Sequence, residues 1–402
     1  MNGGSVNELT MNLDFTENRN ISIPSYFYIT GLSGIPHMRY YYIFLFFVYF
    51  ISLLGNSCLM FVIIMDRNLH TPKYISVFNL SLTDICESTA VIPQLLDTFL
   101  FGNQLIPYGL CLSNMFSNML FFTEQSLTLT VLSFDRLVAI SLPLRYHMIV
   151  THGSMLVIIG ASWTIAMLLT MIGAIFMSRL SFCKFIVTVN SFYCDHGPIY
   201  RSACNNNFPT CNDISINILM GHISFGLLIC TPLILIIISY FCIALALLKI
   251  AHGADRIKAI KTCTSHLILV AIFYLPVLCN VLASVTTPLH PNAQIINNSL
   301  TQTIPPMLNP IIYTLKTEEV MQSIKELYKH SKVNTHNQKP EVVDIPMQSG
   351  PRVAQVGNGE LMIQGNGMAV VEPERQRTEE EPKVWRNLKE PEGRDAAVGV
   401  ES

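Results

Sequence analysis

The stretch VLSFDRLVAISLPLRY (residues 131–146) closes an apolar segment that begins near Cys111 and carries one acid–base pair, Asp135-Arg136. A full charge beside lipid costs free energy, so a charged pair at a membrane boundary needs a physical reason. One interpretation is a helix end whose long side chains extend toward water. The other is a latch, in which Asp135 holds Arg136 at rest and releases it to a cytoplasmic partner. The number and direction of the membrane spans decide between the two.

The composition of the chain indicates an integral membrane protein. Half of the 402 residues are hydrophobic and 13% are charged, whereas an ordinary soluble domain carries about 25% charged residues. The net charge of -2 at pH 7 gives no indication of nucleic-acid binding. The first 39 residues lack the pattern of a cleaved signal peptide, so we expect the first span to act as an uncleaved anchor.

Seven segments are long and apolar enough to suggest membrane spans, each of roughly 20 residues or more. The expected spans are 40–65, 75–101, 112–140, 154–178, 214–248, 263–285 and 294–315. The sixth contains Pro276 and the seventh Pro305, Pro306 and Pro310, which membrane helices tolerate. The predicted fold class is therefore an all-α membrane protein, a seven-transmembrane helix bundle. A count of six stays open if the last segment is re-entrant.

The basic residues predict the direction of the spans. With the N-terminus outside, the predicted first and third outer loops hold no Lys or Arg, whereas the inner loops are basic. This places Asp135-Arg136 at the cytoplasmic side of the plasma membrane. Asn20 begins an Asn-Ile-Ser glycosylation acceptor in the predicted outer N-terminus. Five of the 11 cysteines fall in outer segments, where an oxidising environment favours disulfides.

Several motifs, in order along the chain, resemble those of the vertebrate olfactory receptors, within the rhodopsin-like G-protein-coupled receptors. The length of the second outer loop and the polar N-terminus resemble the fish-type branch of that family. The resemblance covers roughly residues 25–330. The motifs are GN (55–56), LHTPKY (69–74), LSLTD (80–84), LSFDRLVAISLPLRY (132–146), SY (239–240), KAIKTCTSHL (258–267) and PPMLNPIIY (305–313). Lys73, Leu137 and Ser141 replace the residues that are usual in the family.

The resemblance implies an odorant receptor that is not an enzyme. A small-molecule odorant would bind in the outer half of the bundle, and a cyclic-AMP-raising heterotrimeric G protein would bind at the cytoplasmic face, in the cilia of olfactory neurons. The other partner is membrane lipid, and we expect no cofactor and no catalytic metal. The residues assigned to the switch and to G-protein coupling are Asp135, Arg136, Lys258, Lys261, His266, Asn309, Pro310 and Tyr313. Membrane anchoring is an equally good explanation for Lys258 and Lys261.

The resemblance also implies a polar network at membrane depth, formed by Asn56, Asp84 and Asn309 and able to hold sodium beside Asp84. The family places an acid in the third span near this network, but Gln125 stands at that position. Glu124 precedes it and lies about 100° round the helix. We expect Glu124 to be protonated or hydrogen-bonded to a neighbouring helix, with amine recognition as the alternative.

The expected odorant pocket lies between the third, fifth, sixth and seventh spans, with a mostly apolar lining and a few polar groups. Its candidates are Asn118, Phe121, Phe122, Gln125, His222, Phe225, Tyr274, Asn280 and Thr303. For each aromatic residue, packing against a neighbouring helix is the alternative. By resemblance, the disulfides are Cys111-Cys194 and Cys183-Cys204, which leaves Cys211 unpaired. A Cys183–Cys211 pair stays open because sequence does not fix connectivity.

Four regions are expected along the chain. These are an extracellular N-terminus (1–39), the receptor domain (40–315), a short amphipathic eighth helix on the membrane surface (316–330) and a disordered cytoplasmic C-terminal tail (331–402). Two other classes of membrane protein fit the sequence less well. A transporter should show internal repeats, and a membrane enzyme should show a catalytic motif such as HExxH or GxSxG. Neither pattern is present in the sequence.

Overall fold

The structure of the protein is a computed structural model. It describes residues 23–31, 37–182, 184–203, 215–249, 253–286, 290–337, 342–343, 353–356 and 360–363. The chain divides into two compact units, Met1–Tyr328 and Lys329–Ser402, which are treated separately here. Asn20, Cys183, Cys204 and Cys211 lie outside the described residues, so the predicted glycosylation site and second disulfide stay untested.

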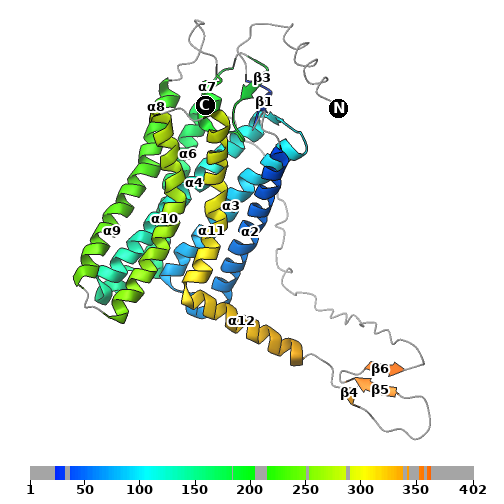
Figure 1. Ribbon diagram of the computed structural model, residues 1–402, viewed down its shortest axis with the longest axis vertical. Helices are drawn as coiled ribbons and strands as arrows, with labels where there is room; N and C mark the ends of the chain where they lie inside the picture. The colour runs from blue at the N-terminus through cyan, green and yellow to red at the C-terminus, as the bar shows by residue number, and fades with distance from the viewer. Residues whose placement is uncertain are drawn as a thin grey trace, which may run out of the picture. The chain divides into compact units, whose positions relative to one another are not determined.

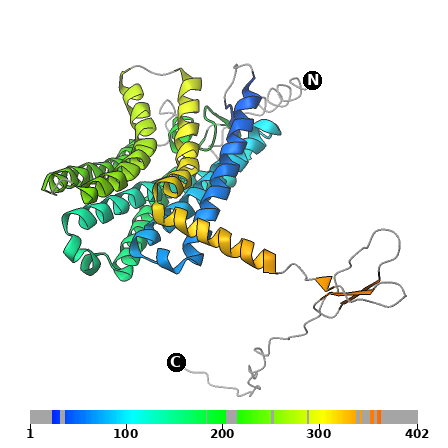
Figure 2. The ribbon, with the colours of Figure 1, turned by 60° about the horizontal axis from the view of Figure 1, so that its bottom comes forward.

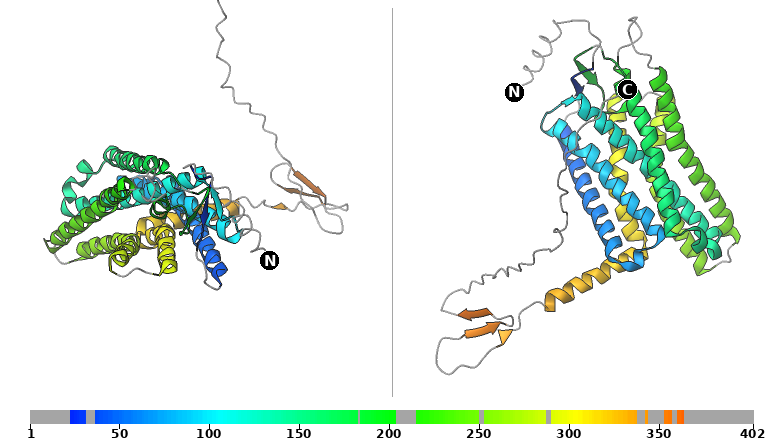
Figure 3. Two further views of the ribbon diagram at one scale, coloured as in Figure 1. Left: turned by 90° about the horizontal axis from the view of Figure 1, so that it is seen from above. Right: turned by 180° about the vertical axis from the view of Figure 1, so that it is seen from behind.

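Seven helical segments form the bundle in the described part of the chain (Figure 1). Their bounds are α2 (Met38–Met65), α3 (Pro72–Leu100), α4 (Tyr108–Ser141), α6 (His152–Ser178), α8 (Ser215–Phe225) continued by η3 (Gly226–Cys230) and α9 (Thr231–Lys249), α10 (Ala254–Thr286) and α11 (Pro291–Lys316). Helices α2, α3 and α11 pack against one another, and α4 packs against α6 and α9 (Figures 1 and 3).

The lengths and hydropathy of these helices fit a protein that crosses the membrane several times. Five described segments are long and apolar enough to span a bilayer, and α4 with the bent continuation Pro143–Ile149 makes a sixth. Helix α11 is the least apolar because three prolines and several Asn, Gln and Thr residues interrupt it. It is nevertheless a continuous helix packed against α2, α3 and α10, rather than a re-entrant loop.

Polar side chains and a glycine accommodate the prolines. Asn56 of α2 donates a hydrogen bond to the Pro306 carbonyl of α11 at 2.8 Å, and Asn297 donates to the Pro276 carbonyl of α10 at 3.3 Å. The Pro306 carbonyl needs the Asn56 donor, because Pro310, four residues later in α11, has no N–H to donate to it. Gly55 lets α2 and α11 approach closely, since a Cβ at that position would lie 3.0 Å from Cγ of Pro310.

The fifth segment contains one π-helical turn, η3, between α8 and α9. Such turns free a backbone carbonyl from its usual partner and are frequent at functional sites. Here the Leu228 carbonyl accepts a hydrogen bond from Ser126 of α4 at 3.0 Å. The Ser126 hydroxyl also lies 2.7 Å from the Tyr274 hydroxyl of α10. Three helices therefore meet at a hydrogen-bonded point inside the bundle.

A three-stranded sheet, which the sequence did not predict, covers one end of the bundle. Strand β1 (Tyr26–Ile29) lies between β2 (Leu105–Pro107), which is antiparallel to it, and β3 (Ile186–Val189), which is parallel. Phe27, Ile29, Ile106, Val187 and Val189 are buried beneath it. We call this end the disulfide end, because Cys111 and Cys194 are joined there. We call the opposite end the Arg136 end.

Short elements complete the structure. The loops contain η1 (Arg67–Leu69), η2 (Pro143–Arg145), α5 (Tyr146–Ile149) and α7 (His196–Arg201). Helix α12 (Glu318–Asn337) begins directly after α11, as Figure 2 shows with the Arg136 end turned forward. It corresponds to the expected eighth helix and extends seven residues beyond the predicted end at 330.

In the second unit, β4 (Val342–Val343), β5 (Val353–Val356) and β6 (Glu360–Ile363) form an antiparallel sheet, whereas the sequence predicted no ordered element after residue 330.

Candidate functional site

Arg136 lies near the end of α4 and is largely enclosed, with a side chain that is 13% exposed. Its Nη1 lies 3.8 Å from Oδ2 of the fully buried Asp135, and Oδ1 of Asp135 accepts a hydrogen bond from the Tyr146 hydroxyl at 2.8 Å. The ion pair is long, whereas the tyrosine bond is short. Asp135 is therefore fixed by Tyr146 and holds Arg136 only loosely, as a latch requires.

Residues of several other segments lie close enough to Arg136 to feel its charge. Among them are Lys73 of α3, His266 of α10, Tyr313 of α11 and Glu319 of α12. The sequence assigned two of these, His266 and Tyr313, to the switch. The sequence predicts Lys73 only as an inner-loop basic residue that departs from the family motif, and it predicts no role for Glu319.

The beginning of α12 is tied to two spans by acid–base pairs. Glu319 accepts hydrogen bonds from Lys73 Nζ at 3.0 Å and from the Tyr74 hydroxyl of α3. Burial alone would raise the pKa of Glu319, but the Tyr74 and Lys73 contacts outweigh it and lower the pKa below its usual range. Glu318 accepts from Lys261 of α10 at 2.6 Å. Adjacent acids thus connect α12 to the second and sixth spans.

The other predicted switch residues lie deeper in the bundle. The His266 ring is 3% exposed, stacks on Tyr240 and lies 2.7 Å from the Tyr240 hydroxyl. It therefore packs between α9 and α10 in this state and is not open to a partner. Pro310 packs against Gly55 as described above. Lys258 lies in α10, and its side chain is outside the described residues.

Asp84 and Asn309 form the centre of the polar network, as predicted. Asn309 Nδ2 donates to both carboxylate oxygens of Asp84, at 3.1 and 2.9 Å. Gln125 Nε2 donates to Asp84 at 3.0 Å, so the structure places Gln125 in this network and not on the wall of a pocket. Asn56 uses its amide hydrogens on the Pro306 and Ser52 carbonyls and does not bond to Asp84 directly.

A second acid, Glu87, belongs to this network and was missed at the sequence level. It lies one turn after Asp84 on α3, is fully buried, and accepts a hydrogen bond from the same Gln125 amide. Its position in an apolar span was a usable signal, because an ionisable residue there is by default a functional candidate. Its Oε1 has no hydrogen-bond partner among the described residues.

Glu124, adjacent to Gln125 in sequence, faces a different pair of helices. Its Oε1 accepts from Ser162 of α6 at 2.7 Å and from Asn79 of α3 at 3.1 Å. The Oδ1 atom of Asn79 in turn accepts from Trp163 at 2.9 Å. The expectation that Glu124 bonds to a neighbouring helix is confirmed by these contacts. They join α3, α4 and α6.

The residues proposed for the odorant pocket divide into two groups. Phe122 stacks on Phe273 of α10 with ring centroids 4.8 Å apart, and Tyr274 meets Ser126, so these two lie between α4 and α10. Asn280 bonds to Asn297 and Asn298 of α11. Phe225 packs against the same apolar cluster as Phe122 and Tyr274. Phe121 instead packs on Trp163 of α6, and His222 and Thr303 bond to carbonyls of their own helices.

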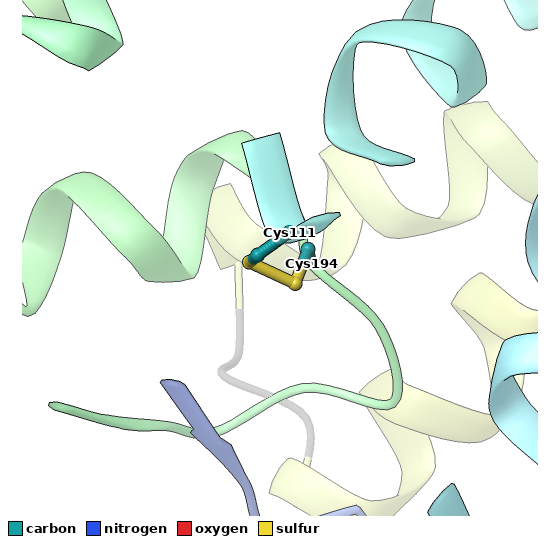
Figure 4. Close-up of a disulfide and its surroundings, with 2 residues drawn as sticks. All are labelled: Cys111 and Cys194. Atoms are coloured by element: carbon teal, nitrogen blue, oxygen red, sulfur yellow. A yellow bond between two sulfur atoms is a disulfide. The ribbon is translucent and has the colours of Figure 1, made fainter. Parts of the chain in front are cut away.

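The second loop of the disulfide end inserts a tyrosine into the bundle. The predicted Cys111–Cys194 disulfide is present and pins this loop to the start of α4 (Figure 4). Tyr193, directly before it, is 8% exposed, and its hydroxyl accepts a hydrogen bond from Gln302 of α11 at 2.7 Å. Asn118 of α4, a predicted pocket residue, also interacts with this hydroxyl. Tyr193 was missed because no sequence pattern indicates which loop residue points inward.

Comparisons with known proteins agree with this geometry. The sequence model described as "Olfactory receptor" matches residues 45–331. Olfactory receptor 13C2 of Homo sapiens is 33% identical over 308 residues, which cover 75% of this chain and 94% of that receptor. Olfactory receptor-like protein COR2 of Gallus gallus is 34% identical over 309 residues, covering 77% and 96% respectively. The chain therefore belongs to the olfactory receptor family of rhodopsin-like G-protein-coupled receptors.

Proposed function

We propose that this odorant receptor binds a small odorant in the half of the bundle next to the disulfide end and activates a cyclic-AMP-raising G protein at the Arg136 end. The observation that carries the proposal is the setting of Arg136. One loosely paired arginine is surrounded by groups from α3, α10, α11 and α12, all of which must rearrange if the helices separate at that end. An odorant that favours the separated arrangement would shift the equilibrium toward it.

The resting arrangement is held by contacts that opening would break. Lys261–Glu318 joins the sixth span to α12, and Tyr240–His266 joins the fifth span to the sixth. Moving α10 outward separates both pairs and uncovers Arg136 for a helix of the G protein. Asn309 and Pro310 lie between the pocket and this end, where the proline weakens the backbone of α11.

The polar network suits a sodium ion in its chemistry. Asp84 supplies buried carboxylate oxygens, which hard cations prefer, and Asn309 and Gln125 hold that carboxylate in place. We assign the sodium role to Asp84, as the resemblance implies. By the positive-inside pattern, the N-terminus is extracellular, the C-terminus is cytoplasmic, and the receptor is placed in the plasma membrane of olfactory cilia.

The proposal is tested with cells that express the receptor and a cyclic-AMP reporter. An active odorant should raise cyclic AMP, and Arg136→Ala should abolish the rise at equal surface expression. Arg67→Ala is the matched control, because Arg67 is an exposed arginine of the first loop at the same end. Normal signalling by the Arg136→Ala receptor would refute the proposed switch.

A further inference from the structure

We propose that the receptor recognises primary amines, and that Glu87 binds their ammonium group together with the amide oxygens of Asn118 and Gln302. This inference rests on the proposed odorant-receptor function and deepens it by naming the ligand class. It starts from three oxygen atoms in the interior of the bundle: Oε1 of Glu87, Oδ1 of Asn118 and Oε1 of Gln302. None of the three has a hydrogen-bond partner among the described residues.

The three side chains are all more than nine-tenths buried, at 0%, 3% and 9% exposure respectively. They come from α3, α4 and α11, on the side of the bundle where Tyr193 enters. Gln302 donates its amide hydrogen to the Tyr193 hydroxyl at 2.7 Å, and Asn118 interacts with that hydroxyl. Glu87 lies about one turn before Val91, which packs in the same buried apolar cluster as Tyr193. The Gln302 amide nitrogen is directed to Tyr193, and the amide oxygens of Gln302 and Asn118 both stay available to another donor.

When Glu87 is ionised, the unmatched atoms are all acceptors, and this sets the chemistry of the ligand. A buried acceptor without a donor costs free energy, and a buried carboxylate costs far more unless a positive group accompanies it. No Lys or Arg occurs in the halves of α3, α4 and α11 that adjoin the disulfide end. An ammonium group carries one positive charge and three donor hydrogens, so it would satisfy both the charge and the three oxygens.

The two carboxylates of α3 are not equivalent. Asp84 accepts two amide contacts from Asn309 and one from Gln125, whereas Glu87 accepts only the one from Gln125. Glu87 also lies one turn nearer to Tyr193 on α3. It is therefore the carboxylate with unused capacity on the side of the bundle where an odorant would bind.

Apolar residues next to this cluster offer a place for an alkyl chain. Val91 follows Glu87 by about one turn on α3, and Ile295 precedes Gln302 by about two turns on α11. Both belong to a buried apolar cluster that also contains Leu95, Phe192 and Tyr193. An alkyl chain on the ammonium group would meet these apolar side chains, whereas an inorganic cation would gain nothing from them.

Glu124 is the competing carboxylate and provides the control. It lies on the helix that carries Asn118, and its Oε2 also lacks a partner among the described residues. However, Oε1 of Glu124 already accepts two hydrogen bonds, and Asn79 beside it uses both its oxygen and its amide nitrogen. None of the three unmatched oxygens of Glu87, Asn118 and Gln302 belongs to this second network.

The test measures thermal unfolding of the purified full-length receptor with n-propylamine to n-octylamine, and with alcohols and carboxylic acids of equal chain length. At least one amine should raise the Tm at a concentration where its alcohol and acid do not. Glu87→Gln should weaken that amine by about 10-fold or more, the usual effect of losing a charged hydrogen bond. Glu124→Gln should leave it unchanged. Gln302→Met, which removes one acceptor from the other side of the cluster, should weaken it by about 3-fold or more, and keeps the test decisive if Glu87→Gln does not fold.

Three results would overturn the inference. One is an amine series that binds no better than the alcohols. Another is a loss of amine binding in Glu124→Gln but not in Glu87→Gln or Gln302→Met. The third is a receptor whose Tm rises when sodium replaces potassium in the buffer, but only if Glu87 is present, and whose Tm does not change with any amine. Because the assay contains no G protein, amine binding without a cyclic-AMP response would count against the proposed function alone. A cyclic-AMP response to the alcohols without amine binding would count against the inference alone.

Discussion

The two ends of the bundle satisfy their polar groups in opposite ways. At the Arg136 end, charges are paired between segments, as in Lys73–Glu319 and Lys261–Glu318, and each partner lies on a different helix. Toward the disulfide end, a covalent bond and a sheet fix the loops, while buried oxygens of Glu87, Asn118 and Gln302 lack described partners. One end can exchange partners by moving helices, and the other can gain partners by binding a ligand. A receptor needs both properties, since one end must bind a ligand and the other must change its helix contacts.

Removing the disulfide should have the largest effect on stability. Cys111→Ser should lower the free energy of unfolding by about 2–5 kcal/mol, because the loop that carries Tyr193 would no longer be tethered. The measurement is the Tm of the purified receptor together with its surface expression. Cys58→Ser is the control, since Cys58 is an exposed free cysteine. Equal loss in both variants would show that the disulfide end does not depend on its covalent tether.

A substitution at Gly55 tests the close packing of α2 against α11 in the middle of the bundle, between the two ends. Gly55→Val should destabilise the receptor by about 1–3 kcal/mol, because the added atoms would press α2 away from Pro310. Gly160→Val is the matched control in α6, where a Cβ would meet no atom within 4 Å. Both are read as Tm of the purified protein. A Gly55→Val receptor as stable as Gly160→Val would contradict the close approach of α2 and α11.

The acid–base pairs of the Arg136 end should have smaller effects, on activity. Lys261 and Glu318 are 54% and 83% exposed, so water screens their interaction and it is worth about 1 kcal/mol or less. Lys261→Met should therefore raise basal cyclic AMP by about 5-fold at most. Lys316→Met serves as the control, because Lys316 is an exposed lysine at the end of α11. A comparable rise in the control would indicate a general effect of charge.

The smallest predicted effect is a pH dependence of stability that comes from His196, at the disulfide end. Burial lowers the pKa of His196 below its usual 6.5. The unfolded chain therefore binds a proton first, and the stability that His196 contributes is lost as the pH falls below about 6.5. The Tm should decline between about pH 7.5 and pH 5.5, and less steeply in His196→Phe. His222→Phe, at an exposed position of α8, should keep the original slope.

The sequence predicted the elements that depend on local composition. The first, second and fourth spans were expected at 40–65, 75–101 and 154–178, and each lies within three residues of the helix observed. The start of α10 at Ala254 was missed, because the prediction began only where the basic residues end. Its first turns are polar, so hydropathy does not detect them. The fish-type assignment stays a prediction.

The features that were missed depend on contacts between distant segments. No periodicity in residues 26–29 indicates that they pair with residues 105–107 and 186–189. Glu124 and Gln125 are neighbours in sequence, but Glu124 bonds to α6 and Gln125 bonds to Asp84. These different partners depend on how the helices pack. Tyr193 follows the same rule: the disulfide could be predicted by resemblance, whereas the direction of the adjacent side chain could not.

The small sheet also orders events during synthesis. Strand β1 pairs with β3 as its parallel neighbour. The pairing of Tyr26 with Ile186 therefore cannot form until Ile186 has been made and lies on the same side of the membrane. By then the residues of four hydrophobic helices, α2, α3, α4 and α6, have been synthesised. The N-terminal segment is thus among the first parts translated and among the last to reach its final place. A tag fused ahead of Tyr26 would need a linker long enough for β1 to reach its place between β2 and β3 after β3 has been made.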